Sequence, residues 1–144
     1  MKQEKKRKSA VGEVLSWLLY MAILVLAAFL LVHFVGERTV VSGDSMSPTL
    51  SDGDNLIVDK FSYRIRSPKR FEIVVFPFRY QKDTYYIKRV IGLPGEQVQI
   101  YNGRVYINGK VLEEPFDFES IRSAGLASEA ITLGEDEYFV LGDN

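Results

Sequence analysis

The chain has 144 residues and a formal net charge of −1, which leaves room for one domain and an appendage. This near-neutral balance provides no broadly basic surface, so we expect no nucleic-acid partner. Cysteine is absent, which excludes disulfides, thiolate nucleophiles and cysteine-ligated metals. The single histidine, His33, lies in the most apolar part of the chain. We therefore expect no Ser-His-Asp triad, no metal site and no cofactor.

Residues 14–35 contain no Asp, Glu, Lys or Arg, and Glu13 and Glu37 flank them. At about 1.5 Å per residue this stretch forms a helix of about 33 Å, which matches a hydrocarbon core of about 30 Å. The alternatives are a buried helix of a soluble protein and a cleavable signal peptide. The stretch exceeds the usual apolar region of a signal peptide, and residues 32–37 offer no small-x-small cleavage site. We predict an uncleaved transmembrane signal anchor at residues 14–35.

The first eight residues are strongly basic, with Lys2, Lys5, Lys6, Arg7 and Lys8 opposed by a single Glu4. Basic residues beside a membrane span are retained in the cytoplasm. We therefore predict a cytoplasmic tail at residues 1–13 and an extracytoplasmic domain at residues 36–144, in a single-pass protein of the cell membrane. A patch that binds anionic lipid or nucleic acid is the alternative interpretation of the basic cluster.

Beyond Gly36 the pattern changes to short β-branched and aromatic runs, which are typical of strands. The expected strands are residues 55–58, 71–76, 85–91, 97–100, 104–107, 110–112 and 138–141. Asn102-Gly103 and Asn108-Gly109 predict two-residue hairpin turns. Residues 113–137 are expected to form a surface excursion with a short helix around residues 120–130. The pattern predicts a single, mostly β domain with antiparallel pairing.

Ser45 lies in a segment, residues 42–50, in which Gly43 permits a tight bend and Pro48 stiffens the exit. A serine at such a bend can present its hydroxyl to a cleft. Serine is a weak nucleophile at neutral pH and needs a base to activate it. A turn serine that only hydrogen-bonds its own loop is the alternative.

Lys88 and Arg89 are adjacent in the expected strand at residues 85–91, so their side chains point to opposite faces. At an ordinary pKa of about 10.4, roughly one lysine in 2,500 is neutral at pH 7. Burial among apolar side chains raises that neutral fraction, and arginine cannot be tuned in this way. Lys88 is therefore a candidate base and Arg89 is not, although a solvated sheet face is an alternative for either cation. Ser–Lys pairs are a known variant of serine catalysis.

Four segments together resemble the motifs of type I signal peptidases, in the order and behind the single span of the short Gram-positive-type enzymes. Residues 42–50 read SGDSMSPTL and resemble the nucleophile motif S/G-x-S-M-x-P-T-L. Residues 86–96 read YIKRVIGLPGE and resemble the lysine box. Residues 70–76 resemble the strand R-G-D-x-V-V-F, and residues 142–144 resemble the opening of the last box, G-D-N.

The resemblance implies a membrane-bound serine endopeptidase with Ser45 as nucleophile and Lys88 as general base. It implies an antiparallel β-sheet or barrel-like catalytic domain behind one transmembrane helix. The partners would be the signal peptides of exported preproteins, cut after an Ala-x-Ala-like site, and the lipid bilayer. The residues expected to line the pockets for the small substrate side chains are Val41, Met46, Leu50, Tyr86 and Ile87. A place in the ordinary hydrophobic core is the alternative for Met46 and Leu50. An apolar, membrane-facing rim is expected near residues 76–78.

The chain departs from the family pattern at several positions. Phe71 and Glu72 replace the usual Gly and Asp, and Gly43 stands where some relatives carry a hydroxyl residue that helps to hold the oxyanion. The expected oxyanion donors are then the amide of Ser45 and, as a second candidate, Ser42. In relatives the last box continues into a segment that supports the lysine and completes the sheet. We therefore expect the domain at residues 36–144 to be incomplete at its C-terminal end.

Two other functions fit part of the pattern. Self-cleaving repressors of the SOS type also use a Ser–Lys pair, but the membrane span and the Pro-Gly-Glu sequence at residues 94–96 disfavour them. A catalytically inactive, single-span relative that acts as a binding or regulatory module is the second alternative. The presence of both Ser45 and Lys88 favours an enzyme.

Overall fold

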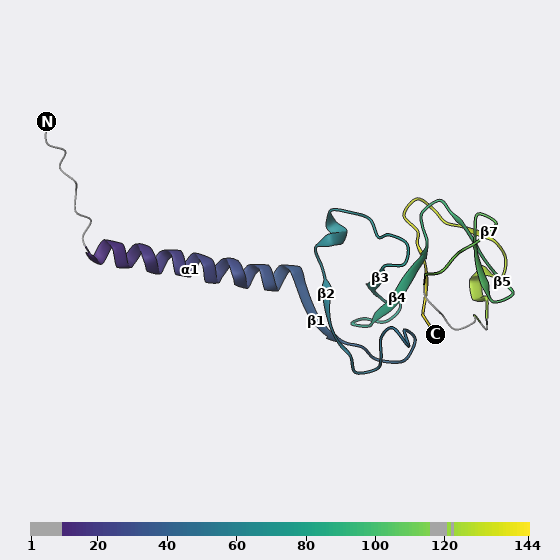
Figure 1. Cartoon of the computed structure of the whole chain (residues 1–144), viewed down its shortest axis with the longest axis horizontal. Coiled ribbons are helices and arrows are strands. Elements are labelled where there is room, and N and C mark those ends of the chain that lie inside the picture. The colour runs from purple at the N-terminus through teal and green to yellow at the C-terminus, as the bar shows by residue number, and fades with distance from the viewer. Residues whose placement is uncertain (1–9, 116–120, 122) are drawn as a thin grey trace, which may run out of the picture.

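The computed structural model describes residues 10–115, 121 and 123–144, with the backbone alone for residues 31–35. A long helix leads into a group of short strands, and the described chain ends close to the middle of that group (Figure 1). The basic cluster predicted at residues 1–8 lies outside the described residues, as does the side chain of His33.

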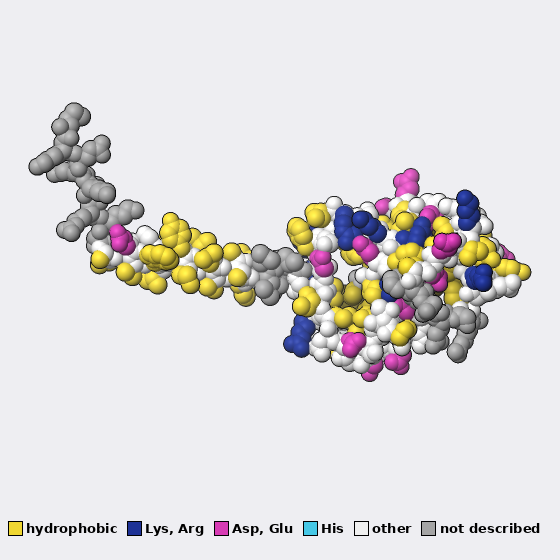
Figure 2. All heavy atoms as spheres, in the orientation of Figure 1, with side chains coloured by type: hydrophobic (Ala, Val, Ile, Leu, Met, Phe, Trp, Pro, Cys, Tyr) yellow, Lys and Arg dark blue, Asp and Glu magenta, His cyan; other side chains and the backbone are white. Residues whose placement is uncertain are grey.

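Helix α1 (Ala10–Val35) is built almost entirely from apolar residues, and its side chains from Ala10 to Leu30 are all exposed. Figure 2 shows this apolar surface along the described part of the helix. The segment Ala10–Leu30 is long and apolar enough to cross a membrane. Because no described part of the protein covers these side chains, water would be a poor solvent for them, whereas a bilayer would suit them.

The first sheet is a two-stranded antiparallel pair of β1 (Gly36–Val40) and β2 (Asn55–Asp59). Strand β1 follows α1 without a linker (Figure 1). The pairing continues past β1, because the amide of Val41 donates to the Asp54 carbonyl at 2.8 Å. The intervening loop, which carries Ser45, is therefore closed at its base.

The second sheet has the order β3-β4-β9, and all its pairings are antiparallel. Its members are β3 (Ile73–Pro77), β4 (Tyr85–Gly92) and β9 (Phe139–Leu141). Strand β4 is central, so Val74 lies opposite Lys88 on one side and Leu141 lies opposite Arg89 on the other. The strand that carries both cations is thus held along both edges.

The third sheet has the order β7-β6-β5-β8. Its strands are β5 (Gln97–Tyr101), β6 (Arg104–Ile107), β7 (Lys110–Val111) and β8 (Ile131–Thr132). Asn102 and Gly103 join β5 to β6 with φ values of 47° and 70°, as a type I′ turn requires. Asn108 and Gly109 do the same between β6 and β7, with φ values of 50° and 75°. Both predicted hairpins are confirmed.

The main hydrophobic core lies between the third sheet and the end of β4. Its buried members are Ile91, Val98, Ile100, Val105, Ile107, Ala127 and Leu133. Gly92 is needed at this junction because a Cβ there would overlap the side chains of Val98 and Leu133. The core anchors the C-terminal half of β4 and leaves Lys88, nearer its start, at the boundary with solvent.

The short connections differ in part from the prediction. The described residues include two 3-10 helices, η1 (Ser62–Arg64) and η2 (Gly125–Ala127). The second lies within the helix expected around residues 120–130, of which residues 120 and 122 are outside the described part. The first was not predicted, because its residues 62–64 have no helical periodicity.

Segment η1 is held in place by Glu72 at the start of β3. Its carboxylate accepts hydrogen bonds from Tyr63 Oη at 3.0 Å and Arg66 Nη1 at 2.9 Å. The Arg66 contact lowers the pKa of Glu72 to about 2. The pKa of Tyr63 rises to about 12, mainly through burial and then through its bond to Glu72. The glutamate that departs from the family pattern thus anchors this connection.

The prediction of a mostly β, antiparallel domain preceded by one apolar N-terminal helix is confirmed. The strands form three small sheets, whereas the sequence had suggested only a single β domain. The first strand after residue 70 begins at Ile73 and not at Phe71, because Phe71 has a φ of 69°. Its phenyl ring packs against the core while its backbone turns.

We predict that Phe71→Gly yields a more stable protein than Phe71→Ala, by about 1–2 kcal/mol. Both variants lose the packing of the ring, but only alanine retains the cost of a side chain in the left-handed region. The free energies of unfolding of the full chain in detergent micelles would be compared. At Ile73, a β3 residue, the same pair should show the opposite order by about 0.5–1 kcal/mol, because glycine weakens a strand. If the Gly and Ala variants had the same order of stability at both positions, this explanation would be contradicted.

Candidate active site

The loop at residues 41–54 presents Ser45 to solvent while its neighbour Met46 is buried with 1% exposure. Two turns fold the loop: the Ser47 amide donates to the Asp44 carbonyl at 2.9 Å, and the Leu50 amide donates to the Met46 carbonyl at 2.8 Å. Gly43 enters them with a φ of 92°, which a side chain would strain. The buried Met46 therefore fixes the loop, and Ser45 projects from it.

The last described residues hold the same loop from the other side. The amide of Asp143 donates to the carbonyl of Ser45 at 3.0 Å. Gly142 lies against that carbonyl so closely that a Cβ would overlap the oxygen. The Gly-Asp-Asn segment thus fixes the backbone of Ser45 and leaves its hydroxyl free to face β4.

Lys88 Nζ lies 2.6 Å from Ser45 Oγ, although the two residues are 43 positions apart in the chain. Lys88 is half-buried, and this burial lowers its pKa below the ordinary lysine value of 10.5. The negative charge of Asp143 acts in the opposite direction. A lysine of lowered pKa within hydrogen-bond distance of a serine hydroxyl can take up its proton.

Arg89 points to the opposite face of β4 and is buried. Its guanidinium makes a two-point ion pair with Asp143, with Nε–Oδ1 at 2.8 Å and Nη2–Oδ2 at 2.6 Å. It also donates to the Phe71 carbonyl at 2.8 Å and to Thr49 Oγ1 at 3.3 Å. Arg89 therefore connects the start of β3, the Ser45 loop and the C-terminal segment. The sequence placed Arg89 opposite Lys88 but did not indicate these partners.

A cavity of about 490 Å³ opens beside the two residues. Of the residues predicted for substrate and oxyanion contacts, it is lined by Val41, Ser42, Ser45, Met46, Tyr86 and Ile87. Leu50 is not among them and instead lines a neighbouring cavity of about 310 Å³. Thr39, Val40, Val75 and Tyr85 also line this cavity and were not among the predicted residues. Tyr85 could have been predicted from the sequence, because it adjoins the lysine box. Val75 could not, because it lines the cavity only as a result of strand pairing.

The aromatic residues expected to form a membrane-facing rim pack on the wall of this cavity. The ring of Phe78 stacks on Tyr86 with centroids 4.6 Å apart, and Phe76 meets Tyr86 edge-on at 6.2 Å. Phe76 and Phe78 are half-buried, and Pro77 between them is exposed. These contacts fix Tyr86 at the cavity, and a role in membrane contact stays a prediction.

Within the described residues, no group of three or more His, Asp or Glu side chains is arranged to hold a metal ion. The reactive side chains that lie together at this site are the Ser45 hydroxyl and the Lys88 amine.

Comparison with known proteins identifies the family of the chain. The model of the family "Signal peptidase, peptidase S26" matches residues 14–144. The chain belongs to this signal peptidase family. Signal peptidase I of Bacillus amyloliquefaciens is 37% identical over 151 residues, which cover 100% of this chain and 80% of that protein. Signal peptidase I T of Bacillus subtilis is 38% identical over 148 residues, which cover 98% of this chain and 76% of that protein.

Among solved structures, a signal peptidase I from Enterococcus faecalis is 34% identical, with a TM-score of 0.41, over 56% of this chain and 80% of that one. The family expected from the motifs at residues 42–50 and 86–96 is therefore confirmed by the family model and the relatives.

We predict that Asp143→Ala lowers the stability of this signal peptidase relative by about 3–5 kcal/mol, because it leaves the buried Arg89 without its carboxylate. Unfolding by urea in detergent micelles would measure the loss. Asp136→Ala, at an exposed site, is the matched control and should change stability by no more than about 0.5 kcal/mol. If the two variants were equally stable, the ion pair would not hold the Ser45 loop as described.

Proposed function

We propose that this chain is a membrane-bound serine endopeptidase that removes signal peptides from exported preproteins after an Ala-x-Ala-like site. Ser45 is the nucleophile and Lys88 is the general base. The observation that carries the proposal is the 2.6 Å separation of Ser45 Oγ and Lys88 Nζ. Membership in the signal peptidase family supports the choice of substrate.

In the proposed reaction, neutral Lys88 accepts the proton of the Ser45 hydroxyl as Oγ attacks the carbonyl carbon of the scissile peptide bond. The resulting ammonium then donates a proton to the departing amine, and the new ester links Ser45 to the signal peptide. Lys88, neutral again, activates a water molecule that hydrolyses this ester. One base thus serves both halves of the reaction without a histidine.

The developing oxyanion needs hydrogen-bond donors at the same site. The amide of Ser45 is the first candidate, because it belongs to the attacking residue, and Ser42 is the second, because it lines the same cavity. Loss of a single such donor costs about 10²–10³ in rate in other serine proteases. Gly43, between them, has no side chain to contribute.

Substrate side chains next to the cut would lie in the cavity of about 490 Å³. Val41, Met46, Tyr86 and Ile87 supply its apolar wall, which suits small side chains such as alanine. Leu50 would contribute only from the adjoining cavity.

The proposed topology places residues 1–13 in the cytoplasm, residues 14–35 across the membrane and residues 36–144 outside it. The basic residues near the N-terminus support this orientation. Because β1 follows α1 directly, the catalytic cavity would lie close to the membrane surface, where a membrane-inserted substrate also emerges.

We predict that Ser45→Ala and Lys88→Ala each reduce cleavage of a preprotein in detergent micelles by about 10⁴-fold or more, with folding retained. Lys88→Arg should be equally inactive, because arginine does not release its proton near neutral pH. Ser47→Ala and Lys110→Ala are the matched controls and should cleave at nearly the rate of the unchanged protein. Normal cleavage by Lys88→Ala or Lys88→Arg would eliminate Lys88 as the base.

We also predict that kcat/KM falls as the pH drops through the pKa of Lys88, because the protonated amine cannot accept the serine proton. Burial lowers this pKa, so the midpoint of the fall should lie below the ordinary lysine value of 10.5. The rate of cleavage of a fixed preprotein would be measured across a range of buffers, with folding checked at each pH. An acid limb with its midpoint at 10.5 or above would show that the site does not lower the pKa of its base.

A further inference from the structure

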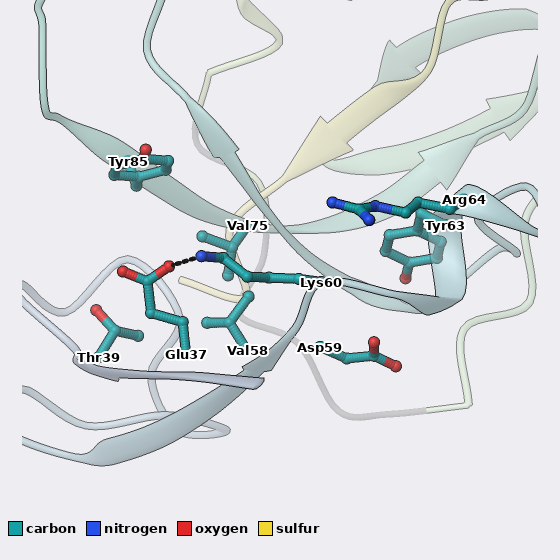
Figure 3. A pocket seen from close by; sticks show the side chains of 9 residues that line it. All are labelled: Glu37, Thr39, Val58, Asp59, Lys60, Tyr63, Arg64, Val75 and Tyr85. Carbon is teal, nitrogen blue, oxygen red and sulfur yellow. Dashed lines mark ion pairs between the residues drawn. The ribbon is translucent and has the colours of Figure 1, made fainter. Parts of the chain in front are cut away.

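A second cavity, of about 560 Å³, adjoins the one beside Ser45 and Lys88 (Figure 3). The two cavities share Thr39, Val75 and Tyr85 in their walls, so they are direct neighbours. The second cavity extends away from Ser45 and Lys88 to Glu37, at the start of β1, and to Lys60, just after β2. Neither residue belongs to the motifs identified in the sequence.

The direction of the hollow relative to a substrate follows from the strands beside it. Along β1 and along β4, residue numbers rise toward the dyad, from Thr39 to Ser45 and from Tyr85 to Lys88. The membrane segment of a signal peptide lies N-terminal to its cleavage site, and α1 of this chain ends where β1 begins. The residues upstream of the cut should therefore run back along β1 toward Glu37. This step rests on the proposed function.

The alternation of side chains sets the register. Val41, Thr39 and Glu37 occupy alternate positions. Val41 and Thr39, together with Val40 between them, line the cavity beside Ser45 and Lys88, and Thr39 and Glu37 line the second cavity. The side chains of an extended substrate also alternate between its two faces. Its residues at −1, −3 and −5, counted back from the cleaved bond, therefore face the same side. With −1 beside Val41 and −3 beside Thr39, the residue at −5 lies beside Glu37.

Glu37 and Lys60 form an ion pair, and Figure 3 shows them pointing toward each other beside Val58 and Val75. Both are accessible, with side-chain exposures of 60% for Glu37 and 47% for Lys60. An accessible pair of this kind can exchange one member for a charged group of a ligand. The two charges cancel in the unliganded protein, so neither sign of substrate charge is favoured while both are present.

We propose that the second cavity is a binding site for the substrate residue five positions upstream of the cut, and that Glu37 and Lys60 together allow it to accept either charge. The substrate class is the polar segment that joins the membrane-spanning part of a signal peptide to its cleavage site. The pair makes the unchanged protein tolerant of either charge at −5, and removal of one partner makes it selective.

The test uses one model preprotein with alanine at −1 and −3 and with either Asp or Lys at −5. The full chain in detergent micelles is compared with Glu37→Gln and Lys60→Gln, and the ratio of kcat/KM for the Asp and Lys substrates is measured for each. Glu37→Gln should shift the ratio toward Asp by about two- to fivefold, and Lys60→Gln should shift it toward Lys by a similar factor. High salt should reduce both shifts.

Glu135→Gln and Lys110→Gln change the net charge equally at exposed positions distant in sequence and should leave the ratio unchanged. Opposite shifts in the two site variants alone would establish the site. Equal ratios in all variants, or the same shifts in the controls, would overturn it. The dissociation constants of both substrates are also measured with Ser45→Ala present in each variant. A chain that cuts neither substrate would therefore contradict the proposed function while the binding ratio still decided the charge preference.

Discussion

The buried ion pair between Arg89 and Asp143 joins the segments on which the candidate active site depends. Its guanidinium also holds the Phe71 carbonyl and Thr49, and the backbone of Asp143 holds the carbonyl of Ser45. A buried ion pair adds little net stability compared with apolar packing, but it is costly to break, and its geometry is specific. Its role here is best understood as positioning: it fixes the Ser45 loop against β4.

Strand β4 also carries Lys88, the neighbour of Arg89, and places it where different chemistry is possible. Lys88 and Arg89 alternate across β4, so one faces the cavity and the other faces the interior. Arginine keeps its charge when buried and pairs with a carboxylate in a fixed two-point geometry. Partial burial of a lysine instead lowers its pKa, so it releases its proton more readily. Asp143 links the two roles, because it neutralises Arg89 and also limits how far the pKa of Lys88 falls.

Features that depend on neighbouring residues were accessible from the sequence. The apolar helix, the Asn-Gly turns after Tyr101 and Ile107, and the strands around them follow from local composition and turn chemistry. The candidate dyad needed motif resemblance in addition, because Ser45 and Lys88 are 43 positions apart and no local pattern joins them.

Features that depend on packing could not be predicted from the sequence. The partners of Arg89 lie as far as 54 positions away, and the choice between Leu50 and Val75 as a cavity wall is decided by how separate sheets meet. The late start of β3 has a similar origin, because the core holds the ring of Phe71 while its backbone turns. The hollow between Glu37 and Tyr85 likewise exists only once β1 and β4 are brought together.

Covalent trapping tests most directly whether Lys88 activates Ser45 as a nucleophile. An Ala-x-Ala peptide with a diphenyl phosphonate in place of the scissile carbonyl reacts with an activated serine, and mass spectrometry locates the adduct. If Lys88 activates Ser45, we expect a single adduct on Ser45 in the unchanged chain and almost none in Lys88→Ala. An adduct on another residue, or equal labelling of Ser45 without Lys88, would contradict it.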